Sequence, residues 1–194
     1  MNKVCSSSSV YECTEALGDY LRSVQESERA GVIALDGFHG IGKSNAARKL
    51  SVLLDVPAVH GDLFIHEDQS KLYPEILNLK CVGKVLRTAT ESGRVVIFES
   101  VHALSILQAL NLTPLEHVYV KHFWPAGVAT HAGALGSEQA LRSCIESEEE
   151  EHRSQGLDPD SEPSLLLELM RYHLIFQPHR RCTLELHHTF APQQ

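Results

Sequence analysis

The residues Gly31-Val-Ile-Ala-Leu-Asp36-Gly-Phe-His-Gly-Ile-Gly-Lys-Ser44 decide the fold of this chain. Residues 31–36 form a short apolar run with β-branched side chains, which predicts a buried parallel strand. Residues 37–44 match the pattern G-x-x-x-x-G-K-[ST] at every fixed position. Residues 45–54 then place their apolar side chains on one helical face. A strand, this loop and a helix in this order predict a phosphate-binding loop, whereas a chance motif in a glycine turn would need neither neighbour.

Each part of the loop has a physical task. Its glycines permit backbone angles and close approach that a side chain would block, so that successive amides can point at phosphate oxygens. Lys43 can reach the outer phosphates, and the Ser44 hydroxyl can ligate Mg²⁺. The predicted nucleotide-binding residues of the loop are Gly37, Phe38, His39, Gly40, Ile41, Gly42, Lys43 and Ser44.

Strands and helices are predicted to alternate on both sides of the loop. Apolar residues at helical spacing over 10–24 predict an amphipathic helix ahead of the loop. Further strands are predicted at 56–60, 94–98, 117–123 and 183–187, and further helices at 77–86, 102–110, 137–153 and 163–173. Such alternation predicts a mostly parallel sheet with helices on both faces and ligands at the carboxyl ends of the strands.

Composition excludes several classes of protein. The 194 residues are enough for one domain with a hydrophobic core, and 43% of them are hydrophobic. The formal net charge of -8 disfavours a nucleic-acid partner. Residues 1–20 lack the pattern of a signal peptide, and no apolar run is long enough to span a membrane. We therefore expect no membrane partner. The five cysteines are scattered and odd in number, so we also expect a reducing, cytoplasmic setting.

The loop and its flanking elements resemble the P-loop kinase family, especially uridine-kinase-like and related small-molecule kinases. This resemblance implies a P-loop NTPase fold of three α/β/α layers, with a roughly five-stranded, mostly parallel sheet and a small lid. Residues 31–194 would form the kinase domain, with the lid at about 137–162, and residues 1–30 would supply a helix that packs on the core.

The resemblance also implies roles for residues outside the loop. Asp62 stands where the family has the carboxylate that orients the acceptor hydroxyl, and it could instead cap a turn. Glu99 ends a predicted strand, where the family contacts substrate or Mg²⁺, and it could equally cap the next helix. Arg142 and Arg153 match the lid arginines that close over the nucleotide. Four glutamates at 148–151 depart from the family pattern, which is rich in arginine there.

The expected activity is therefore transfer of the terminal phosphoryl group from ATP, or GTP, to a hydroxyl of a nucleoside or related small molecule. Lys43 and Asp62 are the expected catalytic residues, Asp62 and Glu99 would bind the acceptor, and Mg²⁺ would accompany the nucleotide. One alternative is a non-catalytic nucleotide-binding regulatory protein, which the glutamate run favours. A switch GTPase is disfavoured because no N-K-x-D-like segment follows a later strand. The sequence leaves the acceptor and the oligomeric state open.

Overall fold

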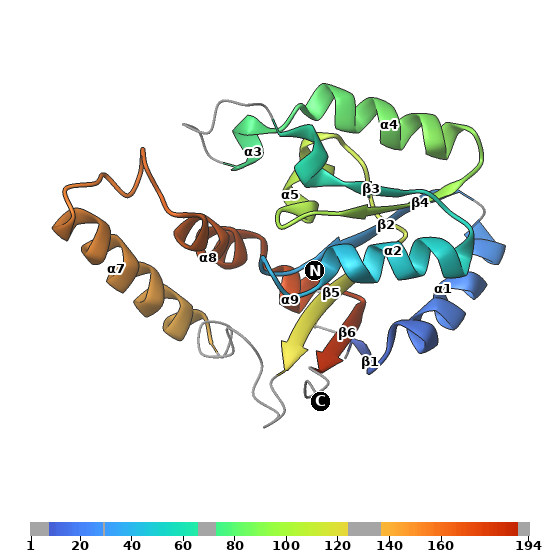
Figure 1. Cartoon of the computed structure of the whole chain (residues 1–194), viewed down its shortest axis with the longest axis horizontal. Coiled ribbons are helices and arrows are strands. Elements are labelled where there is room, and N and C mark those ends of the chain that lie inside the picture. The colour runs from blue at the N-terminus through green and yellow to red at the C-terminus, as the bar shows by residue number, and fades with distance from the viewer. Residues whose placement is uncertain (1–7, 29, 66–72, 124–136, 190–194) are drawn as a thin grey trace, which may run out of the picture.

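The computed structural model describes residues 8–28, 30–65, 73–123 and 137–189. Six strands of these ranges form one sheet in the order β1-β6-β5-β2-β4-β3, and every pair is parallel (Figure 1). The strands are β1 (Ser9–Tyr11), β2 (Gly31–Asp36), β3 (Ala58–His60), β4 (Val95–Glu99), β5 (Glu116–Phe123) and β6 (Leu184–Thr189). The helices are α1 (Thr14–Glu28), α2 (Lys43–Leu54), the short 3₁₀ helix η1 (Gly61–Phe64), α3 (Tyr73–Ile76), α4 (Leu79–Glu91), α5 (Ala103–Ala109), α7 (Glu138–Ser154), α8 (Leu165–Phe176) and α9 (Pro178–Arg181).

Helices cover both faces of the sheet. Helices α1 and α2 pack against each other on one face, where Leu50 and Leu53 lie within 4 Å of the position that a Cβ at Gly18 would take. Helices α4 and α5 lie on the other face, as right-handed crossovers between these strands require. The predicted three-layer α/β class is confirmed, although the sheet has six strands, all parallel, rather than about five.

The central strands β2 and β4 are buried along almost their whole length, because both of their faces are covered. Leu35 pairs with Glu99 across β2 and β4, and His60 pairs with Glu99 across β3 and β4. Parallel strands that are aligned in this way end at the same edge of the sheet. The chain leaves this edge after Asp36, His60 and Glu99, and this convergence builds the candidate site.

The start of the chain differs from the prediction. We expected the first helix to include Val10, but residues 9–11 form the edge strand β1 and the helix begins at Thr14. The amide of Ser9 donates to the carbonyl of Thr183 at 3.3 Å, and β1 continues the sheet beside β6. Pairing with a strand from the far end of the chain therefore overrides the helical spacing. Residues 1–7 and 29 of the expected N-terminal unit lie outside the described residues.

Helix α4 runs through Gly83 without a break, although a glycine lowers helix propensity. A Cβ at Gly83 would lie 2.8 Å from Cδ2 of Leu110, which follows α5. The glycine therefore lets the end of α5 approach α4 closely.

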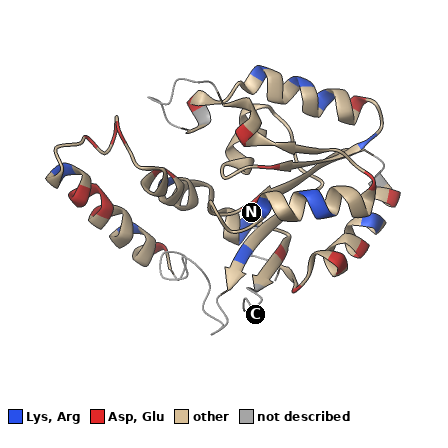
Figure 2. Cartoon of the chain, in the orientation of Figure 1, with Lys and Arg blue, Asp and Glu red and all other residues tan. Residues whose placement is uncertain are grey.

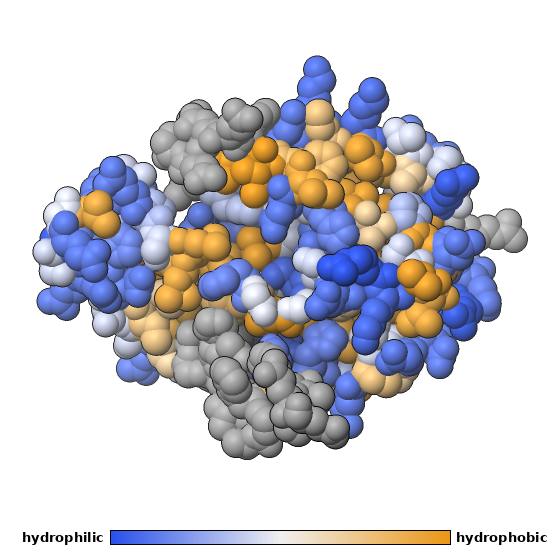
Figure 3. Space-filling view, viewed as in Figure 1, coloured by the Kyte–Doolittle hydropathy of each residue, from blue (hydrophilic) through white to orange (hydrophobic). Residues whose placement is uncertain are grey.

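The surface is mainly hydrophilic on the face that Figure 3 shows. The most exposed large apolar side chains, Val52, Leu63 and Ile175, come from different elements. Acidic residues gather along α7 (Figure 2). Within the described ranges, no helix is long and apolar enough to cross a membrane.

Candidate functional site

The glycine-rich loop 37–44 joins β2 to α2 at the carboxyl edge of the sheet. Gly37 has φ 142°, and a Cβ there would lie 2.5 Å from Cδ1 of Ile41 and 2.7 Å from the carbonyl oxygen of Val120. Only glycine fits this position. Gly42, with φ 94°, is the N-cap of α2, and as a glycine it has no side chain that could cap the helix. The first amides of α2 are thus left for another acceptor, such as an anion.

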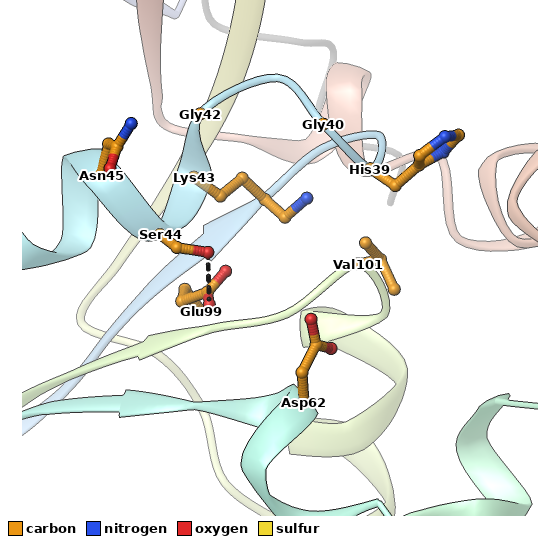
Figure 4. Close-up of a pocket in the computed structure, with 9 residues that line it drawn as sticks. All are labelled: His39, Gly40, Gly42, Lys43, Ser44, Asn45, Asp62, Glu99 and Val101. Atoms are coloured by element: carbon orange, nitrogen blue, oxygen red, sulfur yellow. Dashed lines mark hydrogen bonds between the residues drawn. The ribbon is translucent and has the colours of Figure 1, made fainter.

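A cavity of about 280 Å³ opens beside this loop (Figure 4). It is lined by His39, Gly40, Gly42, Lys43, Ser44, Asn45, Asp62, Glu99 and Val101. The structure thus brings four of the predicted functional side chains, Lys43, Ser44, Asp62 and Glu99, around one space. Phe38 and Ile41 are buried and do not line it, so only their backbone could serve a ligand there.

Lys43 is the cation of this cavity. Its side chain is buried, and its Nζ donates to the carbonyl oxygen of Phe38 at 2.5 Å. Burial lowers the pKa of Lys43, while the negative charges of Glu99, Asp36 and Asp62 oppose this shift. An anion in the cavity would therefore meet a poorly hydrated ammonium group, which interacts more strongly than a solvated one.

Ser44 and Glu99 meet at the floor of the cavity. The Ser44 hydroxyl donates to Oε1 of Glu99 at 3.0 Å, and Nδ1 of His60 lies 2.8 Å from the same oxygen. Hydroxyl and carboxylate oxygens are the ligands that Mg²⁺ prefers, so this pair fits that ion. The alternative role of Glu99 was to cap the next helix, α5. The amide of His102, at the start of this helix, donates instead to the Ser100 hydroxyl at 3.3 Å.

Asp62 lies opposite, on η1 (Figure 4). Its Oδ1 accepts a hydrogen bond from the Tyr73 hydroxyl at 2.5 Å. The Tyr73 hydroxyl also lies 3.2 Å from that of Ser100. A Cβ at Gly61 would lie 2.9 Å from the Ser100 hydroxyl, so the glycine leaves room for this arrangement. Asp62 is thus held facing the cavity by a neighbour that the sequence did not point to.

Tyr73 is fixed in turn by Glu168 of α8. Oε1 of Glu168 accepts from the Tyr73 amide at 2.7 Å and lies 3.5 Å from Nε2 of His102. Burial raises the pKa of Glu168 to about 7 and lowers that of His102 to about 4. Helix α8 therefore supports Asp62 indirectly. The poorly solvated carboxyl group of Glu168 bonds Tyr73, and Tyr73 bonds Asp62.

This support predicts a pH-dependent stability. The folded-state pKa of Glu168, about 7, lies above its ordinary value of 4.5. Its contribution to stability is therefore present below pH 4.5 and is lost as the pH rises through about 7. Glu168→Gln keeps an oxygen for the Tyr73 amide and removes the charge. We expect it to melt at a higher temperature than the wild type at pH 8, with the gain shrinking towards pH 5.

Thermal melts of both proteins between these pH values test this prediction. Glu91→Gln, at the end of α4, is the control that removes an exposed charge. A constant difference across the pH range would contradict the assignment.

Asp36 ties the loop to three other elements. Its carboxylate accepts from the amides of Gly37 at 2.7 Å and Leu104 at 3.3 Å and from the Tyr172 hydroxyl of α8. Nε2 of His117 in β5 lies 3.7 Å away. Burial would raise the pKa of Asp36, but His117 and Tyr172 together hold it below its ordinary value. The carboxylate is therefore a structural junction behind the loop.

Removal of the hydrogen bond from Tyr172 to Asp36 should lower the stability of the fold. We expect Tyr172→Phe to lower the free energy of unfolding by about 1–3 kcal/mol, because a buried charged acceptor loses a donor. Equilibrium unfolding in urea measures the loss. Tyr20→Phe is a matched control, since its hydroxyl bonds Glu116 at 2.8 Å at an exposed site. If the two changes lower the free energy of unfolding equally, the buried hydrogen bond contributes no more to stability than the exposed one, and the prediction is wrong.

The predicted roles of Arg142 and Arg153 are not supported by their positions. Both are exposed on α7 and neither lines the cavity. Arg142 pairs with Glu138 at 2.7 Å, and Arg153 pairs with Glu149 at 3.1 Å. Glutamates four residues before each arginine favour such pairs along the helix. Helix α7 instead packs its apolar side on α8.

The fold and the cavity define an α/β protein with a glycine-rich loop site at the carboxyl edge of a parallel sheet. No family model matches the chain, and neither does any curated protein. Among solved structures, it is similar to one described as a "putative fructose transport system kinase" from Silicibacter sp. TM1040. The identity is 16% and the TM-score 0.46, over 93% of this chain and 100% of that one. A similarity this low establishes neither a family nor an activity.

Proposed function

We propose that this protein is a phosphotransferase of the P-loop kinase type, which moves the terminal phosphoryl group of ATP or GTP to a hydroxyl of a small molecule. A nucleoside or related metabolite is the acceptor class that we propose. The observation that carries the proposal is the convergence of Lys43, Ser44, Asp62 and Glu99 on one cavity beside a glycine-rich loop.

Each side chain has a role in this proposal. The loop amides and Lys43 would bind the phosphates, and Lys43 would exchange its bond with Phe38 for one with a phosphate oxygen. Ser44, with Glu99 behind it, would hold the Mg²⁺ of the nucleotide. Bound there, this ion would neutralise charge on the phosphates. Tight positioning of donor and acceptor would supply most of the acceleration.

Asp62 would orient the acceptor and take its proton. In the transfer, a bond forms between the acceptor oxygen and the terminal phosphorus, and the bond from that phosphorus to the nucleoside diphosphate breaks. The acceptor proton passes to the Asp62 carboxylate late in the step. The bond from Tyr73 would keep this carboxylate directed at the cavity.

One observation favours a second candidate, a non-catalytic nucleotide-binding protein. Arg142 and Arg153 are occupied by glutamates outside the cavity, and Arg171 is bonded to Glu149 at 2.6 Å and to Asp160 at 2.8 Å. These contacts keep three arginines of α7 and α8 on neighbouring carboxylates. A nucleotide sensor would need only the loop and a change of shape on binding.

The deciding experiment measures Mg²⁺-dependent turnover of ATP and GTP with a panel of nucleosides, sugars and vitamins, and detects the phosphorylated acceptor by mass spectrometry. Acceptor-stimulated release of nucleoside diphosphate in equal amount to phosphorylated product supports the phosphotransferase. Nucleotide binding without turnover supports the sensor. A chain that binds no nucleotide in calorimetry would refute both.

A further inference from the structure

A histidine shares the carboxylate on which the proposed metal site depends. Oε1 of Glu99 lies 3.0 Å from the Ser44 hydroxyl oxygen and 2.8 Å from Nδ1 of His60. The sheet register causes this contact, because His60 and Glu99 are paired at the ends of β3 and β4. The side chain of Glu99 is 5% exposed, whereas that of His60 is 23% exposed.

The hydrogen bonds determine which atoms donate and which lone pairs stay available to a cation. An ionised carboxylate only accepts, so the contact assigns the proton to Nδ1 of His60. The Ser44 hydroxyl has a single proton, and it donates this proton to Glu99. The lone pairs of the Ser44 oxygen are therefore left for a cation. The Ser44 lone pairs keep their direction only while the Glu99 carboxylate stays within hydrogen-bond distance of the Ser44 hydroxyl.

Neither packing nor contact with a nucleotide explains why a histidine stands at position 60. It lies at the end of β3, which is an edge strand of the sheet, and its side chain is partly exposed. It does not line the cavity either, so direct contact with a nucleotide does not explain it. Mg²⁺ also prefers oxygen ligands to an imidazole. In the part of the chain that the structure describes, the side chain of His60 makes a polar contact with Glu99.

We propose that His60 is a positioning residue for the Mg²⁺ of the nucleotide. Its Nδ1–H holds the Glu99 carboxylate against the Ser44 hydroxyl, and so keeps the Ser44 lone pairs directed to the ion. The inference rests on the proposed nucleotide site and deepens it. Partners that orient metal ligands from behind typically contribute about 10–100-fold to metal affinity.

Two variants separate the hydrogen bond from the shape of the ring. His60→Asn keeps an N–H close to the position of Nδ1, whereas His60→Leu keeps a similar volume without a donor. Calorimetry measures the affinity for ADP in EDTA and in saturating Mg²⁺, and the ratio of the two affinities gives the gain due to the ion. We expect this ratio to be about tenfold smaller in His60→Leu than in the wild type, and to change little in His60→Asn.

The affinity for ADP in EDTA should be the same in all three proteins. In turnover, His60→Leu should need about tenfold more Mg²⁺ for half-saturation, with kcat unchanged once the ion saturates. His187→Leu is the matched control, since Nε2 of His187 bonds Glu185 at 2.9 Å with a similar exposure of 24%, away from the cavity.

Three results would overturn the inference. His60→Leu could keep the full gain, His60→Asn could lose as much as His60→Leu, or affinity in EDTA could fall as far as affinity in Mg²⁺. If the wild type binds no ADP in either condition, the proposed function fails together with the inference. If the wild type shows the gain and His60→Leu shows it equally, only the inference fails.

Discussion

Lys43→Met is expected to lower acceptor-stimulated phosphoryl transfer by about 100- to 1000-fold, the usual effect of removing one charge-stabilising donor from an active site. The stem of the side chain is kept, but the ammonium group that faces the cavity is lost. Burial lowers the pKa of Lys43, so the folded state disfavours its charged form. The melting temperature should therefore stay the same or rise.

Initial rates with the acceptor found in the panel, together with thermal melts, measure both effects. Lys84→Met on α4 is the control, because this exposed lysine lies outside the cavity. A variant that melts like the wild type and retains more than about a tenth of its rate would contradict the role of Lys43.

Asp62→Asn is expected to lower the same rate by about 100- to 10,000-fold, because an amide cannot take the acceptor proton. The amide oxygen can still accept from Tyr73, so the geometry of η1 should be kept. The affinity for ADP with Mg²⁺ should be almost unchanged, since Asp62 acts on the acceptor side. This combination separates the acceptor role from nucleotide binding.

Single-turnover rates and calorimetry with ADP test this expectation. Asp19→Asn on α1 is the control, because Asp19 is exposed and pairs only with the nearby Arg22 at 3.5 Å in the described contacts. Loss of ADP affinity in Asp62→Asn, in parallel with the rate, would assign Asp62 to the nucleotide instead.

The part of the site that could be predicted from sequence is local or follows from the parallel sheet. The strand 31–36 has the bounds that its apolar run predicts, and the loop and helix follow it directly. Asp62 was predicted from the resemblance to P-loop kinases, and Glu99 from that resemblance together with its place at the end of a strand. Both line the cavity. Their chemical roles remain predictions.

The rest depends on contacts between distant segments. Tyr73 and Glu168 support Asp62 through hydrogen bonds across the fold, and no spacing in the sequence relates them. The contact between His60 and Glu99 follows from the register of β3 and β4, which the sequence does not give. The sequence likewise did not show that Arg142 and Arg153 pair with glutamates one helical turn earlier, and their role at the nucleotide stays a prediction.

The pairing of β1 with β6 also bears on how the protein is made. Ser9 is among the first described residues, yet its strand partner includes Leu184 near the other end of the chain. During translation, β1 must therefore wait until Leu184 and the residues after it have been made before its partner strand can emerge. Its unpaired edge is open to other strands in that interval, and pairings between such distant segments also slow folding. Emergence of β6, rather than formation of the loop and α2, should be the event that completes the sheet.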